Sequence, residues 1–164
     1  MAALLLNRGR LKPDRIHTLI FLVSHDIDKL HNKIKFRADT NGVYSYYVDE
    51  ILMRLFKKRY IKRYKLKIGL TPLGRKKANE IILRYPYLFT LQSFVKFLKR
   101  LDDEEILAIL YYVFPKYFEN VPKLERIEQN RLELAVRLYL KRKVPIEVAA
   151  RISGYRLTDF VETL

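Results

Sequence analysis

Apolar residues recur every three or four positions in two stretches near the start of the chain, which is the spacing of amphipathic α-helices. The first stretch covers residues 15–30 and the second about residues 46–58. The repeating positions are Ile16, Leu19, Ile20, Val23, Ile27 and Leu30 in the first, and Val48, Ile51, Leu52, Leu55 and Phe56 in the second. Between them, Asn41-Gly42 predicts a turn, and Ser45 is suited to cap the second helix.

The period changes to two in the segment YIKRYKLKI, residues 60–68, where large apolar or aromatic residues alternate for several positions with bases. A period of two predicts strands, and Gly69 is expected to close the second of them. Thr71 and Pro72 then suit the N-cap and first position of another helix. A helix, a basic hairpin and a helix in this order are typical of a winged helix-turn-helix, in which the hairpin is the wing.

The rest of the chain predicts more helices and a second helix-turn-helix. Pro86 breaks the chain before expected helices at residues 88–101 and 102–114, and a longer helix is expected at 124–141. Pro145 opens a short helix, and Gly154 suits the left-handed turn before a last helix at 156–164. Four consecutive acids, residues 102–105, are interpreted as helix-start residues that favour the helix dipole, in preference to a metal or nuclease site.

These elements predict a mainly α protein: a winged helix-turn-helix with a short β-hairpin wing, additional helices and a small C-terminal helix-turn-helix. The expected domains are a winged-helix DNA-binding domain at 1–85, a helical extension at 86–122 and a C-terminal unit at 123–164. A homodimer is expected, because two-fold pairing doubles the contacts with a palindromic site. Its predicted interface is the apolar surplus in LFTLQSFVKFLKRL and LAILYYVF.

The formal net charge of +15 points to a polyanionic partner, nucleic acid first and an anionic membrane surface second. Residues 54–77 hold eleven bases and no acid. Scarce Gln beside abundant Lys, Arg, Ile and Tyr fits a thermophilic origin. No apolar run is long enough for a transmembrane helix, and the bases near the start follow the apolar run in the wrong order for a secretory signal, so a cytoplasmic protein is expected.

The candidate DNA-binding residues lie on the second helix and on the wing. The predicted set is Tyr44, Ser45, Tyr46, Tyr47, Glu50, Arg54, Lys57, Lys58, Lys62, Arg63, Lys65 and Lys67. The wing bases are expected to contact phosphates, while Arg54 and Glu50 suit guanine and cytosine edges in the major groove. Tyr46 and Tyr47 have a second interpretation as surface packing residues.

Two resemblances rest on short motifs. Residues 15–120 resemble the YwgA-like group of winged-helix proteins through Gly42, Tyr44 and Ser45 in the turn, with Val43 in place of the group's proline. The other matches are Leu70, Thr71 and Gly74 at the wing exit and Phe114-Pro115-Lys116-Tyr117 late in the segment. This resemblance implies a DNA-binding regulator without an established catalytic activity.

Residues 132–164 resemble small prokaryotic antitoxin-like proteins, whose helix-turn-helix carries an Ala-Ala pair. Ala149 and Ala150 match the pair, and Ser153 replaces a second small alanine. The resemblance implies an antitoxin-like unit that binds a partner protein.

The predicted function is therefore a DNA-binding transcriptional regulator that acts on duplex DNA, with an antitoxin-like regulator as one form of this prediction. The alternatives are a protein-interaction module and an RNA-binding protein, since Tyr60 and Tyr64 among bases suit stacking on unpaired nucleotides. An enzyme is not expected, because no phosphate-binding loop, triad or metal-ligand spacing occurs. His17, His25 and His31 are interpreted as surface or cap residues, no metal or cofactor is expected, and the absence of cysteine excludes disulfides.

Overall fold

The computed structural model describes residues 2–6, 9–26 and 33–164. It is mainly helical with two small antiparallel hairpins, which confirms the predicted mainly α class. The chain divides into two compact units: unit 1 comprises Met1–Arg37 and Val43–Leu98, and unit 2 comprises Ala38–Gly42 and Lys99–Leu164. The boundary between Leu98 and Lys99 falls inside the expected helical extension. The roles assigned to the three predicted segments stay predictions.

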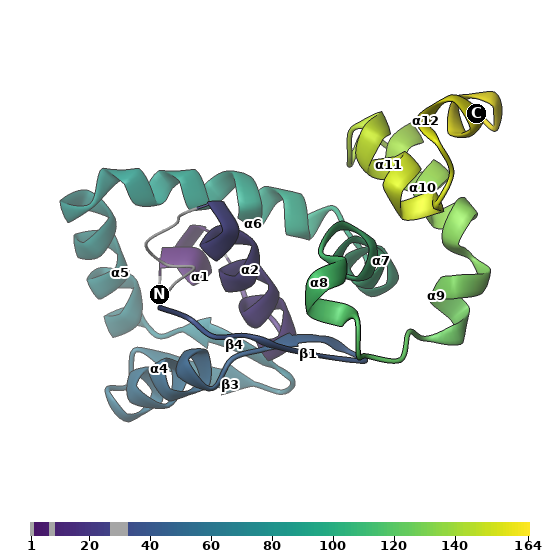
Figure 1. Ribbon diagram of the computed structural model, residues 1–164. Coiled ribbons are helices and arrows are strands. Elements are labelled where there is room, and N and C mark those ends of the chain that lie inside the picture. The colour runs from purple at the N-terminus through teal and green to yellow at the C-terminus, as the bar shows by residue number, and fades with distance from the viewer. Residues whose placement is uncertain (1, 7–8, 27–32) are drawn as a thin grey trace. The chain divides into compact units, whose positions relative to one another are not determined.

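Unit 1 combines helices with the basic hairpin (Figure 1). Its elements are α1 (Ala2–Leu6), α2 (Pro13–Asp26), α4 (Tyr46–Lys57), β3 (Ile61–Tyr64), β4 (Lys67–Leu70), α5 (Pro72–Arg84), the 3-10 helix η1 (Pro86–Thr90) and α6 (Leu91–Lys99). The helix predicted at 15–30 is described from Pro13 to Asp26, and the expected positions Ile27, Leu30 and His31 lie outside the described residues.

The hairpin β3–β4 confirms the predicted strands, with Ile61 opposite Leu70 and Tyr64 opposite Lys67. Because side chains alternate between faces, Ile61, Ile68 and Leu70 share one face, and all three are buried. They form a core with Val48 and Leu52 of α4 and with residues of α1, α2 and α5. Gly69 lies within β4, so it does not close the strand as predicted, and Leu70 is the last strand residue.

A second hairpin, which the sequence pattern did not predict, pairs β1 (Arg37–Asp39) with β2 (Gly42–Tyr44). The prediction was limited to the turn at Asn41-Gly42. Asp39 Oδ1 accepts a hydrogen bond of 2.8 Å from the Asn41 backbone, and Gly42 has a φ of +133°, which favours glycine. Strands of three residues are too short to establish an alternating pattern.

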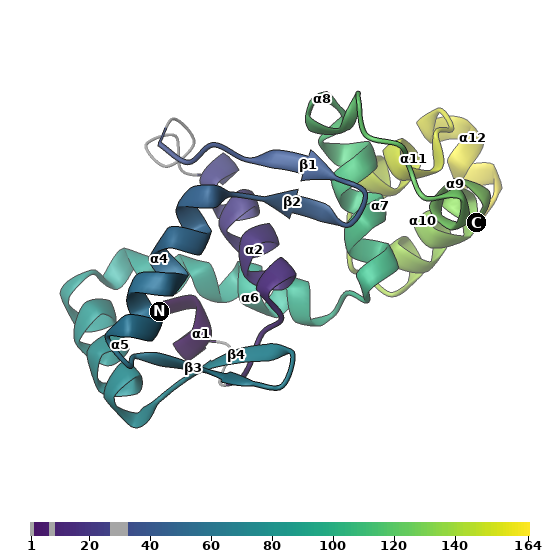
Figure 2. The ribbon, with the colours of Figure 1, turned by 90° about the horizontal axis from the view of Figure 1, so that it is seen from below.

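Unit 2 packs short helices around α7 (Figure 2). Its helices are α7 (Asp103–Val113), α8 (Pro115–Phe118), α9 (Glu125–Gln129), α10 (Arg131–Leu140), α11 (Ile146–Ser153) and α12 (Leu157–Glu162). The helix predicted at 124–141 is two helices, separated at Asn130. Gly154 takes the predicted left-handed conformation, with φ +82°.

The α7 helix corrects the predicted dimer interface. Every residue from Ile106 to Tyr112 is buried, so most of the segment LAILYYVF is the core of unit 2 and is not a surface for a second chain. At the start of α7, Asp102 and Glu105 form a reciprocal capping box, which confirms the helix-start interpretation of the four acids. Within the described residues, no helix is long and apolar enough to cross a membrane.

Gly74 fixes how α5 leaves the wing. The Thr71 side chain caps α5 by accepting a hydrogen bond of 3.0 Å from the Gly74 backbone. A Cβ at Gly74 would lie 1.8 Å from the carbonyl oxygen of Tyr60, which itself accepts a hydrogen bond from the Thr71 backbone. Only a residue without a Cβ lets the helix start this close to the backbone of Tyr60, the residue before β3.

We therefore expect Gly74→Ala to lower the free energy of unfolding by at least about 2 kcal/mol, because backbone has to move to make room. The control is Asn79→Ala on the exposed side of α5, which should change it by no more than about 0.5 kcal/mol. Denaturation in urea measures both variants. Equal stability of the two variants would contradict the close approach of α5 to Tyr60.

Candidate nucleic-acid interface

The positive charge of the protein belongs entirely to one unit. By sequence, unit 1 holds 21 Lys and Arg against 6 Asp and Glu, a net charge of +15. Unit 2 holds 12 of each, a net charge of zero. The long-range electrostatic field of the protein is therefore set mainly by unit 1.

Most bases of residues 54–77 have no acidic partner. Arg54 pairs with Glu50 at 2.6 Å and Lys77 with Glu80 at 2.8 Å. In the part of the chain that the structure describes, the other nine of the eleven bases lie within 4.0 Å of no carboxylate. These nine are Lys57, Lys58, Arg59, Lys62, Arg63, Lys65, Lys67, Arg75 and Lys76. No carboxylate of the described residues neutralises their charges.

The outer face of α4 combines bases with large side chains. Tyr46 is 81% exposed, Tyr47 50% and Met53 56%, and Arg54, Lys57 and Lys58 are exposed beside them. The ion pair between Arg54 Nη2 and Glu50 Oε1 lies in solvent on this face. Since the opposite face buries Val48 and Leu52, α4 presents one defined surface.

The start of α4 is fixed by His17, which is buried on α2 and which the sequence suggested to be a surface or cap residue. His17 Nδ1 accepts a hydrogen bond of 3.1 Å from the Ser45 backbone. In the neutral ring the proton is then on Nε2, which faces Asp49 Oδ1 at 3.2 Å. The His17 ring also stacks on Tyr44 at 5.0 Å. The hydrogen bond to Ser45 spans 28 residues of sequence, so no local pattern indicated it.

Tyr44 and Ser45 take part in this anchor. The Tyr44 hydroxyl donates a hydrogen bond of 2.7 Å to Asp49 Oδ2, and that bond to a carboxylate raises the pKa of Tyr44 above its ordinary value. Ser45 is 1% exposed, and its hydroxyl has no hydrogen-bond partner among the described residues. Ser45 is therefore not available to a surface ligand, in contrast to its predicted place in the site.

The four predicted wing bases Lys62, Arg63, Lys65 and Lys67 are all exposed on β3–β4 and its turn. The hairpin runs beside α4, and β3 contacts that helix (Figures 1 and 2). The Arg63 guanidinium lies 5.9 Å from the Phe56 ring, and Lys62 Nζ lies 4.9 Å from the Tyr64 ring. Leu66 at the tip is 82% exposed. The β3–β4 hairpin thus extends the basic surface of α4.

Among the described residues, no group of three His, Asp or Glu side chains is placed to hold a metal ion. Comparisons with protein-family models, curated proteins and solved structures give no match. The two resemblances noted in the sequence stay predictions.

Proposed function

We propose that this protein is a winged-helix regulator that binds duplex DNA through α4 and the β3–β4 wing. The observation that carries the proposal is the set of nine bases in residues 54–77 that have no acidic partner among the described residues, on the unit that holds the whole net charge. Uncompensated Lys and Arg gain most from phosphates, since each phosphate contact releases counterions from DNA. An exposed helix beside a basic hairpin suits the major groove with flanking backbone contacts.

In this proposal the wing bases contact phosphates and α4 reads bases. The Glu50–Arg54 ion pair holds the guanidinium on the exposed face before DNA arrives. An exposed pair of this kind contributes about 0–1 kcal/mol, whereas a bidentate contact with guanine discriminates by about 1–3 kcal/mol. It is therefore favourable for Arg54 to exchange the Glu50 carboxylate for a guanine edge. Glu50 is then free to accept a hydrogen bond from cytosine.

Duplex DNA is favoured over single-stranded RNA by the environment of Tyr64. The Arg10 guanidinium lies 3.6 Å from the centre of the Tyr64 ring, so one face of this ring is already covered. Tyr46 and Tyr47 are the exposed aromatic residues of α4 that remain for stacking. Competition of duplex DNA with single-stranded RNA and with structured RNA at matched salt distinguishes these partners.

Unit 2 supports a second function, self-association. Leu157 and Val161 are spaced i and i+4 on α12 and are 44% and 50% exposed, and Leu164, which follows the end of the helix, is 47% exposed. Phe160 is buried on the other side of α12. Because unit 2 has no net charge, two copies can approach through it without the repulsion that acts between two copies of unit 1. We propose a second copy of this chain as the occupant of the α12 face.

The wing variant combines Lys62→Ala, Arg63→Ala, Lys65→Ala and Lys67→Ala. We expect weaker binding to every duplex, and a slope of log affinity against log salt that is smaller by about 0.9 for each phosphate that the variant no longer neutralises. The matched control removes four exposed bases of unit 2, Lys116, Lys141, Arg142 and Arg151, and so has the same net charge. Salt titrations of both variants measure the effect. Equal slopes in the two variants would show that the wing is only a solvated surface.

Arg54→Ala tests whether α4 reads sequence. Binding to a duplex selected from a random pool should weaken by about 1–3 kcal/mol more than binding to a scrambled duplex. Lys57→Ala, one turn further along the same exposed face, should weaken both alike because it acts on phosphates. Competition binding with the two duplexes gives the ratio. A uniform loss in Arg54→Ala would assign Arg54 to the backbone.

Leu157→Glu with Val161→Glu tests the α12 face. The wild type should form a dimer in light scattering, and the double variant should remain monomeric because it places four like charges in the interface. The control is Leu73→Glu with Leu83→Glu, which alters two exposed apolar residues of α5 in unit 1 and should leave the dimer intact. A monomeric wild type, or an intact dimer in the α12 variant, would contradict the proposal.

A further inference from the structure

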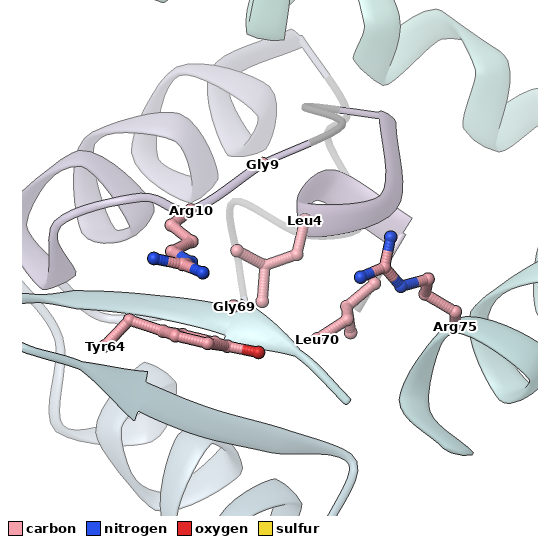
Figure 3. A pocket seen from close by; sticks show the side chains of 7 residues that line it. All are labelled: Leu4, Gly9, Arg10, Tyr64, Gly69, Leu70 and Arg75. Carbon is pink, nitrogen blue, oxygen red and sulfur yellow. The ribbon is translucent and has the colours of Figure 1, made fainter. Parts of the chain in front are cut away.

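A pocket of about 220 Å³ lies in unit 1 beside the β3–β4 hairpin (Figure 3), and none of the described residues that line it belongs to α4. Its wall comes from α1, from the segment that precedes α2, from both strands of the hairpin and from α5. Two arginines, Arg10 and Arg75, line it from different elements, with the Leu4 side chain between them in Figure 3. No acidic residue is among the described residues that line it.

The guanidinium groups of Arg10 and Arg75 both have N–H donors that no described residue uses. Arg10 stacks on Tyr64 at 3.6 Å, a contact that uses the face of the guanidinium and leaves its in-plane N–H groups unused. Arg75 lies in the first turn of α5. Within the described ranges, neither guanidinium has a hydrogen-bond acceptor or a carboxylate partner. Both side chains are exposed, so these donors can be reached from solvent.

The arginine–tyrosine stack depends on a glycine. A Cβ at Gly69 would lie 2.9 Å from Tyr64 Cε2 and 3.0 Å from Arg10 Cγ. The absence of this atom lets both side chains lie close against β4. Leu4 and Leu70, both buried, add an apolar part to the wall. The pocket therefore has a cationic and an apolar side.

We propose that this pocket binds a phosphate group, with Arg10 and Arg75 as its ligands. The planar guanidinium fork fits phosphate oxygens in a bidentate manner, which a lysine does not. The volume is below the roughly 300–1,000 Å³ of a drug-sized site, so it suits one phosphate with a short substituent. Such a group comes from a small phosphate ester or from the DNA backbone, and the experiment distinguishes these sources.

The test is a titration of the full chain with inorganic phosphate and with phenyl phosphate at constant ionic strength, followed by NMR chemical shifts. Wild type should saturate, with a Kd near 1 mM for inorganic phosphate, about −4 kcal/mol. Arg75→Ala should weaken binding about tenfold or more, and Arg75→Lys should recover only part of it. Arg10→Ala should act like Arg75→Ala.

The matched control is Lys76→Ala, which removes the same charge from the next residue of α5 but does not line the pocket. Its phosphate affinity should stay within about twofold of wild type, because screened charges contribute little. Thermal melting without phosphate checks that each variant is folded. If Arg10→Ala is unfolded, Arg75→Ala and Lys76→Ala decide the test alone. Titrations that do not saturate, or equal losses in Arg75→Ala and Lys76→Ala, would overturn the proposal.

The two sources give different results with DNA. For a small ester, phenyl phosphate binds more tightly than inorganic phosphate, and Arg75→Ala leaves the salt slope of duplex binding unchanged. For a backbone phosphate, Arg75→Ala reduces that slope by about 0.9, and phosphate competes with DNA. The proposal does not rest on the wing as a DNA-binding element. Phosphate binding without DNA binding would contradict only the regulator, and the reverse would contradict only the pocket.

Discussion

Repulsion among like charges is the constraint under which unit 1 folds, because its basic side chains outnumber its acidic ones by 21 to 6. At a protein surface, two such charges about 4 Å apart repel by roughly 4 kcal/mol, and in bulk water by about 1 kcal/mol. The wing offsets this repulsion with one buried face, since Ile61, Ile68 and Leu70 each contribute roughly 1.5–3 kcal/mol. Its four bases are exposed, so water and salt screen their charges.

The elements that could be predicted are those in which a strong local pattern agrees with the packing. The wing alternates apolar and basic residues, Thr71 caps α5 as its sequence position indicates, and Gly154 occupies the left-handed turn. The pattern gave no indication of β1–β2, whose strands are three residues each, or of the break at Asn130, because apolar spacing continues across it.

The same distinction holds within the candidate site. The predicted residues of α4 and of the wing lie on the surface, because amphipathic spacing identifies the exposed face of an element. Ser45 does not lie on the surface. No pattern in the sequence indicated that its backbone N–H would donate a hydrogen bond to His17 of α2. The α4 face is therefore predictable as a surface, whereas the contacts that hold its first turn in place depend on tertiary structure.

The two units use their bases differently. In unit 2, Lys143 Nζ lies 2.6 Å from Glu105, which is fully buried, and Arg131 donates to the carbonyl groups of Ile152 and Arg151. Loss of one partner from a buried pair costs about 3–5 kcal/mol, because the other charge is left uncompensated. Exposed bases such as those of the wing contribute about 0–1 kcal/mol or less to stability. Lys143 and Arg131 therefore maintain the structure of unit 2. The exposed bases of the β3–β4 hairpin, by contrast, can be replaced without loss of the fold, so the charge of unit 1 can be changed with little change in its stability.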